Sequence, residues 1–230
     1  MTKKSAILNL DLINKNIEFS RLQNNPHHIV KVVGVSKYHS SDDVRILYEA
    51  GQRAFGENKV QDLKNKIEAL KDLPIEWHLV GNLQTNKINA LIDCEPFLVH
   101  SLDGYELASE LDKRLKIKNK TMNCLLQINS ANEDTKSGVN PENAVEIYKK
   151  IQNDFSNINL KGIMSIGAHV EDHNIIELSF KKTEEIFKQL EYCGAKICSM
   201  GMSSDYPLAI ANGSNMIRVG SILFKDEERI

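Results

Sequence analysis

The chain has 230 residues, of which 41% are hydrophobic and 26% charged, so it is long enough to bury a core without disulfide support and has the composition of a soluble globular protein. Its 29 lysines and arginines against 31 aspartates and glutamates give a net charge of −2, which argues against a broad nucleic-acid-binding surface. No apolar run approaches the roughly 18 residues of a membrane span, Asn9 and Asp11 interrupt any signal peptide, and the four cysteines form no C-x-x-C pair, so we expect a cytoplasmic protein with reduced thiols.

Short apolar runs alternate with longer amphipathic stretches along the chain. The first amphipathic stretch covers residues 7–22 and precedes the first apolar run. Several of the runs are continuously apolar and rich in β-branched residues, as strands covered on both faces are. The predicted strands are residues 31–36, 54–57, 76–80, 98–102, 123–129, 160–166, 196–200 and 216–219.

Between these runs, apolar residues recur at helical spacing. Ser40 and Asp43 have the pattern of a capping box, and Gly51 is placed to end that helix. Further predicted helices lie within residues 60–70, 145–155, 180–194 and 206–212. Eight strands alternating with helices predict an α/β fold, a closed (β/α)₈ barrel of the TIM type, with an open doubly wound sheet as the alternative. We expect residues 1–230 to form a single domain.

Lys37 directly follows the first predicted strand. In a barrel, the carboxyl ends of the strands face the mouth that carries function. An amine set in an apolar wall loses hydration, which lowers its pKa and frees it to attack a carbonyl, as a Schiff base requires. The alternative is a solvated lysine at a strand end. Lys87 and Lys136, in predicted loops on the same mouth, are either rival amines or solvated lysines.

Polar residues follow the last two predicted strands. Ser203 and Ser204 precede the short helix of residues 206–212, where hydroxyls and free backbone N–H groups bind anions. Gly220, after the last strand, lets the backbone approach a ligand closely, and Ser221 adds a donor. Barrels commonly bind phosphate on these two loops, although the serines also suit helix caps and the glycine a tight turn.

A lysine and a phosphate cradle on neighbouring strands suit a ligand with an aldehyde at one end and a phosphate at the other. Pyridoxal 5′-phosphate (PLP) is such a ligand. Arg218 is the candidate partner of the pyridine nitrogen, and because a guanidinium only donates, it would keep that nitrogen unprotonated and the ring a poor electron sink. The alternative from another class is an aldolase that uses Lys37 without PLP, with Glu57 or His78 as its acid–base residue.

Eight segments of the chain occur in the order of a known family's motifs. They are VVGVSKY, FGENKVQD, EWHLVGNLQTNK, VHSLD, LLQINSANEDTKSG, LKGIMSI, CSMGMSSD and IRVGSILF. The chain resembles the pyridoxal phosphate homeostasis protein family, whose barrel is similar to the N-terminal domain of alanine racemase. The resemblance implies that PLP is held on Lys37, with Arg218 near the pyridine nitrogen and Asn58 near the ring. It also implies phosphate contacts from Ser203, Ser204, Gly220 and Ser221.

The family resemblance further implies a role in intracellular vitamin B6 homeostasis without established catalytic turnover. A PLP-dependent racemase-like enzyme is the alternative, and it needs two bases. Lys37 supplies one, but related racemases take the second, a tyrosine, together with a C-terminal β-domain for which the few residues after Phe224 leave no room. Tyr38 is expected to point away from the pocket, since side chains alternate along a strand.

We therefore expect a monomeric carrier that stores, protects or delivers PLP. Its expected partners are PLP and PLP-dependent apo-enzymes, with no nucleic acid and no membrane. No metal is expected, because His169 and His173 have the spacing of a metal-binding pair but no third ligand at an evident spacing.

Overall fold

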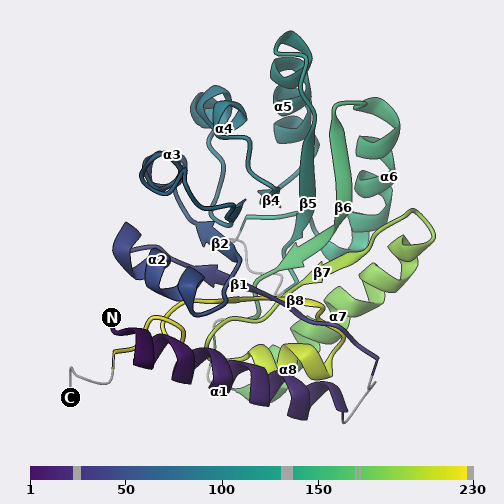
Figure 1. Cartoon of the computed structure of the whole chain (residues 1–230). Coiled ribbons are helices and arrows are strands. Elements are labelled where there is room, and N and C mark those ends of the chain that lie inside the picture. The colour runs from purple at the N-terminus through teal and green to yellow at the C-terminus, as the bar shows by residue number, and fades with distance from the viewer. Residues whose placement is uncertain (23–26, 131–136, 169, 171, 227–230) are drawn as a thin grey trace.

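The structure, a computed structural model, describes residues 1–22, 27–130, 137–168, 170 and 172–226. Its strands are β1 (Lys31–Val35), β2 (Ala54–Glu57), β3 (Glu76–Leu79), β4 (Leu98–Leu102), β5 (Met122–Ile128), β6 (Ile158–Ser165), β7 (Ile197–Ser199) and β8 (Met216–Val219). These parallel strands pair in chain order and β8 pairs with β1, so the predicted (β/α)₈ barrel is confirmed and the open doubly wound sheet is wrong (Figure 1). Lys136 and His169, two candidates named above, lie outside the described residues.

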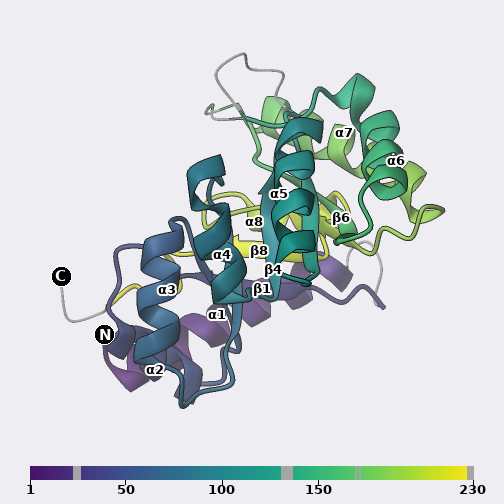
Figure 2. The same cartoon turned by 90° about the horizontal axis from the view of Figure 1, so that it is seen from above.

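Helices surround the barrel. They are α1 (Lys3–Leu22), α2 (Ser41–Glu49), α3 (Val60–Ala69), α4 (Ile88–Cys94), α5 (Tyr105–Ile117), α6 (Ala144–Asp154), α7 (His173–Glu191) and α8 (Tyr206–Ala211). Two 3₁₀ turns, η1 (Thr85–Lys87) and η2 (Pro141–Asn143), lead into α4 and α6. Figures 1 and 2 show α1 lying along the barrel beside α2 and α8, which it contacts.

The start of α2 shows how local sequence determines an element. Ser40 is the N-cap, and its hydroxyl accepts a hydrogen bond from the Asp43 backbone N–H at 3.1 Å. The Asp43 carboxylate accepts from the Ser40 backbone N–H at 3.2 Å, which completes the predicted capping box. Gly51, in the left-handed region with a φ of 119°, follows the end of the helix, as predicted.

Helix α4 is an element that the sequence pattern does not predict. The segment before it, which contains Lys87, is predicted as a loop, whereas it forms η1 and leads directly into α4. Only Ile88, Leu91 and Ile92 of this seven-residue helix are buried. Three apolar positions are too few to give a periodic signal.

Apolar and polar side chains together fill the inside of the barrel. The apolar group comes from β1, β2, β4, β5, β6 and β8; it consists of Val33, Ala54, Leu98, Leu125, Met164 and Met216. Because inward positions recur at every second residue of a strand, the next inward residue after Leu98 is His100, and the next after Met216 is Arg218. Both are buried, so polar side chains stand among the inward residues nearer the carboxyl ends of the strands.

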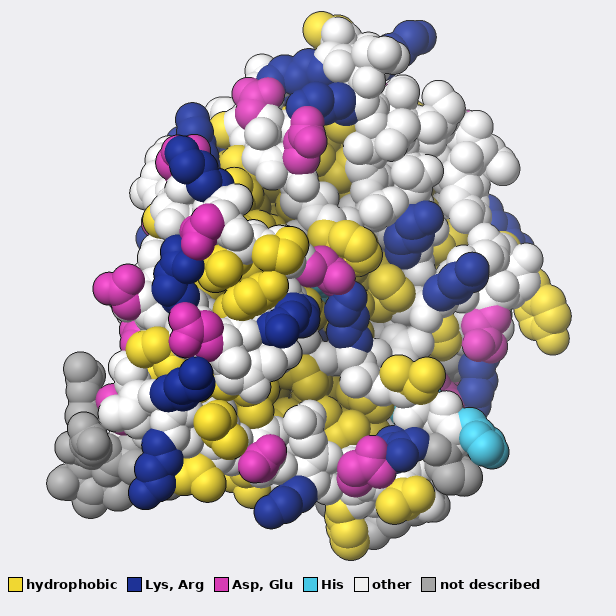
Figure 3. Space-filling view, viewed as in Figure 1, with side chains coloured by type: hydrophobic (Ala, Val, Ile, Leu, Met, Phe, Trp, Pro, Cys, Tyr) yellow, Lys and Arg dark blue, Asp and Glu magenta, His cyan; other side chains and the backbone are white. Residues whose placement is uncertain are grey.

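The surface mixes charges of both signs. On the face seen in Figure 1, lysines and arginines are interspersed with aspartates and glutamates (Figure 3). This face therefore carries no extended patch of one charge. Within the ranges that the structure describes, none of the helices combines the length and the apolar character that crossing a membrane requires.

Candidate functional site

A cavity of about 490 Å³ opens at the carboxyl ends of the strands. It is lined by all of the binding residues predicted from the sequence, namely Lys37, Asn58, Ser203, Ser204, Arg218, Gly220 and Ser221. Its wall also includes Val35, Val80, Gly81, Ile166 and Met202. Loops that are far apart in the sequence converge here because all strands of a parallel barrel end on the same side.

Lys37 lies beyond the end of β1, on a turn that leads outward. The preceding residue, Ser36, is fully buried, whereas Lys37 is exposed at the cavity. Of the two alternatives for Lys37, its exposure fits the lysine at a strand end, because the strand ends at Val35 and the chain turns at Tyr38, which has a φ of 70°. Tyr38 is 88% exposed and does not line the cavity, so it points away from it as predicted.

Arg218 is one of the polar residues inside the barrel and is 5% exposed. Its Nη1 donates to the Ser199 hydroxyl at 2.7 Å and its Nη2 to the Ser165 carbonyl at 2.9 Å. Burial lowers the pKa of Arg218 to about 10, although the charge of Asp205 raises it, so the group stays cationic at neutral pH. A guanidinium has five N–H donors, and acceptors among the described residues take two of them, so Arg218, which lines the cavity, has donors left for a bound group.

The loops after β7 and β8 meet at the cavity. The Gly220 backbone N–H donates to the Ser203 hydroxyl at 3.1 Å. In the part of the chain that the structure describes, the backbone N–H groups of Ser203, Ser204 and Ser221 have no acceptor. A Cβ at position 220 would lie 3.1 Å from the Val35 carbonyl oxygen, so the close approach of these two strand ends favours glycine.

Helix α8 begins close to its predicted position. Its N-cap is Asp205, so the alternative that Ser203 and Ser204 cap this helix is wrong. The Asp205 carboxylate accepts from the Met202 backbone N–H at 2.6 Å. Burial raises the pKa of Asp205, while this hydrogen bond and the charge of Arg218 lower it. With only six residues, α8 adds little dipole, so the hydroxyls and free N–H groups are the main donors to an anion.

Neither acid–base residue of the aldolase alternative lines this cavity. Glu57 is fully buried and forms an ion pair with Lys66. His78 is fully buried inside the barrel, with its Nδ1 2.9 Å from the Nε2 of His100. The aldolase reading therefore lacks, beside Lys37, the group that would dehydrate a carbinolamine.

Sequence reasoning missed part of the cavity wall. Val80 and Gly81 follow β3, and Ile166 follows β6. Like Lys37, each lies just after the carboxyl end of a barrel strand. A position at or just after the end of a predicted strand is therefore the sequence feature that could have identified these three wall residues. The rival amine, Lys87, is exposed on η1 and does not line the cavity.

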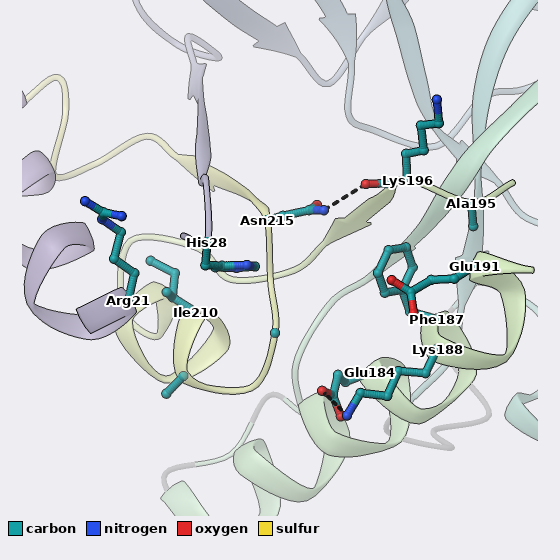
Figure 4. A pocket seen from close by; sticks show the side chains of 12 residues that line it. Arg21, His28, Glu184, Phe187, Lys188, Glu191, Ala195, Lys196, Ile210 and Asn215 are labelled. Carbon is teal, nitrogen blue, oxygen red and sulfur yellow. Dashed lines mark hydrogen bonds and ion pairs between the residues drawn. The ribbon is translucent and has the colours of Figure 1, made fainter. Parts of the chain in front are cut away.

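A second cavity, of about 630 Å³, lies at the opposite end of the barrel (Figure 4). It is lined by α1, α7, α8 and the segments before β1, β7 and β8, with none of the predicted binding residues among its lining. Lys188 in its wall pairs with Glu184 at 2.6 Å, and the Asn215 side chain donates to the Lys196 carbonyl at 2.8 Å. These wall groups therefore already have partners.

Comparison with known proteins gives consistent matches. A sequence profile of the alanine racemase N-terminal domain matches residues 8–228. The pyridoxal phosphate homeostasis protein of Helicobacter pylori is 50% identical over 217 residues, which cover 94% of this chain and 97% of the relative. An unknown protein from Bifidobacterium adolescentis has a TM-score of 0.90 at 28% identity, covering 96% of this chain and 95% of that one. PipY of Synechococcus elongatus, solved with PLP bound, has a TM-score of 0.77 at 31% identity, covering 91% and 98%.

The barrel and the profile together define the class of protein: an α/β barrel of the alanine racemase N-terminal-domain type. Within this class, half of the aligned residues are identical to the Helicobacter pylori relative over nearly the full length of both chains. The chain belongs to the pyridoxal phosphate homeostasis protein family, and the resemblance seen in its motifs is confirmed.

Proposed function

We propose that this chain is a PLP-binding protein of intracellular vitamin B6 homeostasis, which holds PLP as a Schiff base on Lys37 without catalytic turnover. One observation carries the proposal: an amine, several anion donors and a buried guanidinium line a single cavity of about 490 Å³. Pockets for small cofactors measure roughly 300–1,000 Å³, so the size is suitable. The name of the Helicobacter pylori relative and the PLP-bound PipY structure support the same conclusion.

The residues present match the chemical groups of PLP. The Lys37 amine condenses with the aldehyde and releases water. The phosphate accepts hydrogen bonds from the free N–H groups and hydroxyls of the loops after β7 and β8, which include Ser204 and Ser221. Arg218 has unused N–H donors and no acceptor of its own, so it donates to the pyridine nitrogen and leaves that nitrogen unprotonated.

The composition of the cavity wall supports a carrier over the racemase-like alternative. Racemisation needs a proton acceptor on each face of the bound substrate. Among the described residues that line the cavity, Lys37 and Arg218 are the basic side chains, no histidine, tyrosine, cysteine or carboxylate is present, and Tyr38 lies outside the lining. The proposal includes a single barrel domain that is monomeric and cytoplasmic, with PLP and the apo-enzymes that receive it as partners.

The covalent bond is tested by adding PLP to the purified protein. We expect visible absorption from the imine, and after borohydride reduction we expect peptide mass mapping to find the label on Lys37. Lys37→Ala should lose both signals. Lys87→Ala, which removes an exposed lysine outside the cavity, should keep both. A label on another amine, or none, contradicts the proposal.

The same preparation tests turnover. Incubation of the PLP-loaded protein with single enantiomers of amino acids should leave their chirality unchanged when followed by chiral chromatography. Conversion that disappears in Lys37→Ala would favour the racemase-like alternative.

A further inference from the structure

A continuous row of hydrogen-bonded side chains crosses the inside of the barrel behind Arg218. We call Arg218, Ser199, His100, His78 and Glu76 the interior chain. They come from β8, β7, β4 and β3, and all except Glu76, which is partly buried, are at most 5% exposed.

Each link of the interior chain is within hydrogen-bond distance. After the Arg218–Ser199 bond, the Ser199 hydroxyl lies 3.3 Å from His100 Nδ1. The Nε2 of His100 lies 2.9 Å from the Nδ1 of His78. The Nε2 of His78 lies 2.9 Å from the Glu76 carboxylate, which also pairs with Lys31. The row thus runs from the ligand cavity to the start of β1 and β3.

The Glu76 end of the interior chain, with both rings neutral, determines the direction of every bond up to Ser199. Arg218 has only donors, so the Ser199 oxygen accepts from it and the Ser199 proton is available for His100 Nδ1. The Glu76 carboxylate, paired with Lys31, has only acceptors, so His78 Nε2 must carry a proton. A neutral His78 then accepts at Nδ1, which requires a proton on His100 Nε2. A neutral His100 then accepts at Nδ1, and Ser199, which accepts from Arg218, has its proton available for that bond.

We infer that the interior chain is one-directional: both of its histidines are neutral and carry their proton on Nε2, and it positions Arg218 as a donor toward the cavity. Ser199, His100 and His78 are positioning residues, since none of them lines the cavity. The role toward the ligand rests on the proposed function, whereas the direction of the bonds does not.

The charges around the interior chain are consistent with this assignment. Burial lowers the pKa of His100 well below its ordinary value, and the nearby positive charge of Arg218 lowers it further. Burial also lowers the pKa of His78, although Glu76 raises it. The dipoles of the neutral groups then point their positive ends toward Glu76 and their negative ends toward Arg218. Aligned hydrogen bonds of this kind strengthen one another.

In this arrangement Arg218 has a neutral hydrogen-bond partner, Ser199, which leaves the positive charge of the guanidinium unneutralised. Within the described ranges, no carboxylate forms an ion pair with the Arg218 guanidinium. Its cation is stabilised by aligned neutral groups, and its remaining N–H donors stay available to the cavity. Loss of the Ser199 hydroxyl should therefore loosen Arg218 while leaving its charge in place.

The direction is tested on the protein without PLP by nitrogen NMR of isotope-labelled histidine at pH 7, with resonances assigned by replacing one ring at a time. We expect His78 and His100 to be neutral Nε2–H tautomers. In Ser199→Ala, the Nδ1 resonance of His100 should shift because its donor is gone. A ring protonated on Nδ1, or a charged ring, in the unaltered protein would overturn the inference.

Ser165→Ala is a matched control. Both serines are fully buried and adjacent to Arg218, but Ser165 bonds to it through the backbone carbonyl, which alanine keeps. Ser165→Ala should leave the His100 resonance unchanged. An equal shift in both variants would mean that general repacking, and not the interior chain, moves it.

The positioning role is tested by titration with PLP. Ser199→Ala should weaken PLP binding by about tenfold, as loss of a hydrogen bond to a charged group does, and shift the visible absorption. Ser199→Thr, which keeps the hydroxyl, should restore both, and Ser165→Ala should change neither. Affinity and spectrum unchanged in Ser199→Ala would overturn the positioning role. If the unaltered protein binds no PLP, the proposed function fails while the NMR result still decides the direction.

Discussion

At the scale of single residues, Lys66 holds together the strand ends that present the ligand-binding side chains. Its amine donates to the Ser36 carbonyl at 2.6 Å and forms an ion pair with Glu57, which is fully buried. The residues that follow Ser36 and Glu57 in the chain are Lys37 and Asn58. One buried cation therefore fixes the end of β1 against the end of β2, directly beside two predicted ligand contacts.

Replacing Lys66 should be costly because it leaves the Glu57 carboxylate buried without a counter-charge. We expect Lys66→Met to lower the free energy of unfolding by about 3–5 kcal/mol, as measured by urea denaturation. Lys64→Met makes the same change at an exposed position of the same helix and should stay within about 0.5 kcal/mol of the unaltered protein. Similar losses in the two variants would show that the ion pair is not the cause.

At the scale of elements, one glycine allows β6 to pair with both of its neighbours. Gly162 has a φ of 149° and lies where the register between β5 and β6 shifts. A Cβ at this position would lie 1.9 Å from the carbonyl oxygen of Ile197 in β7. No side-chain movement relieves this contact, because the neighbouring atom belongs to the backbone of a central strand.

Gly162→Ala should therefore destabilise the barrel by on the order of 3 kcal/mol or prevent folding, because the strands must separate to admit the methyl group. Gly194→Ala is the comparison, since Gly194 also has a positive φ, 84°, but has open space around it. It should cost about 1 kcal/mol from backbone strain alone. Thermal unfolding followed by circular dichroism distinguishes them, and equal midpoints would contradict the steric argument.

The elements differ in how far the sequence determines them. Strands were predictable because each is a compact apolar run, and the predicted and observed bounds of β2, β4 and β8 coincide. Helix α4 was not, since its seven residues and three buried positions are too few for a sustained repeat. The candidate binding residues could be predicted because functional side chains of a barrel lie just after its strands, and the ends of the strands can be located in the sequence.

What the sequence could not supply is the contact between distant residues. Ser199 and His100 are 99 positions apart, and their hydrogen bond exists only because β4 and β7 both turn these side chains into the barrel. The exposure of Lys37 was left open for a related reason: where the strand ends and the chain turns depends on the packing of Ser36 and its neighbours, not on the pattern of the strand.

At the scale of the whole molecule, the two interior histidines link stability to pH. Burial lowers the folded-state pKa of both His78 and His100 below the ordinary value of 6.5. Above pH 6.5 both rings are neutral in the folded and unfolded states, so their contribution to stability is fully present. As the pH falls below 6.5, the unfolded chain takes up protons that the folded barrel does not, and stability is lost.

The unaltered protein should therefore lose stability between pH 7 and pH 5, with a slope of about 1.4 kcal/mol per pH unit for each proton taken up on unfolding. His100→Gln removes one of these protons and should make the slope shallower, whereas His173→Gln, which changes an exposed ring at the start of α7, should leave it unchanged. Urea denaturation at several pH values measures all three. A slope unaffected by His100→Gln would mean that this ring is already charged inside the barrel, which the direction of the interior chain does not allow.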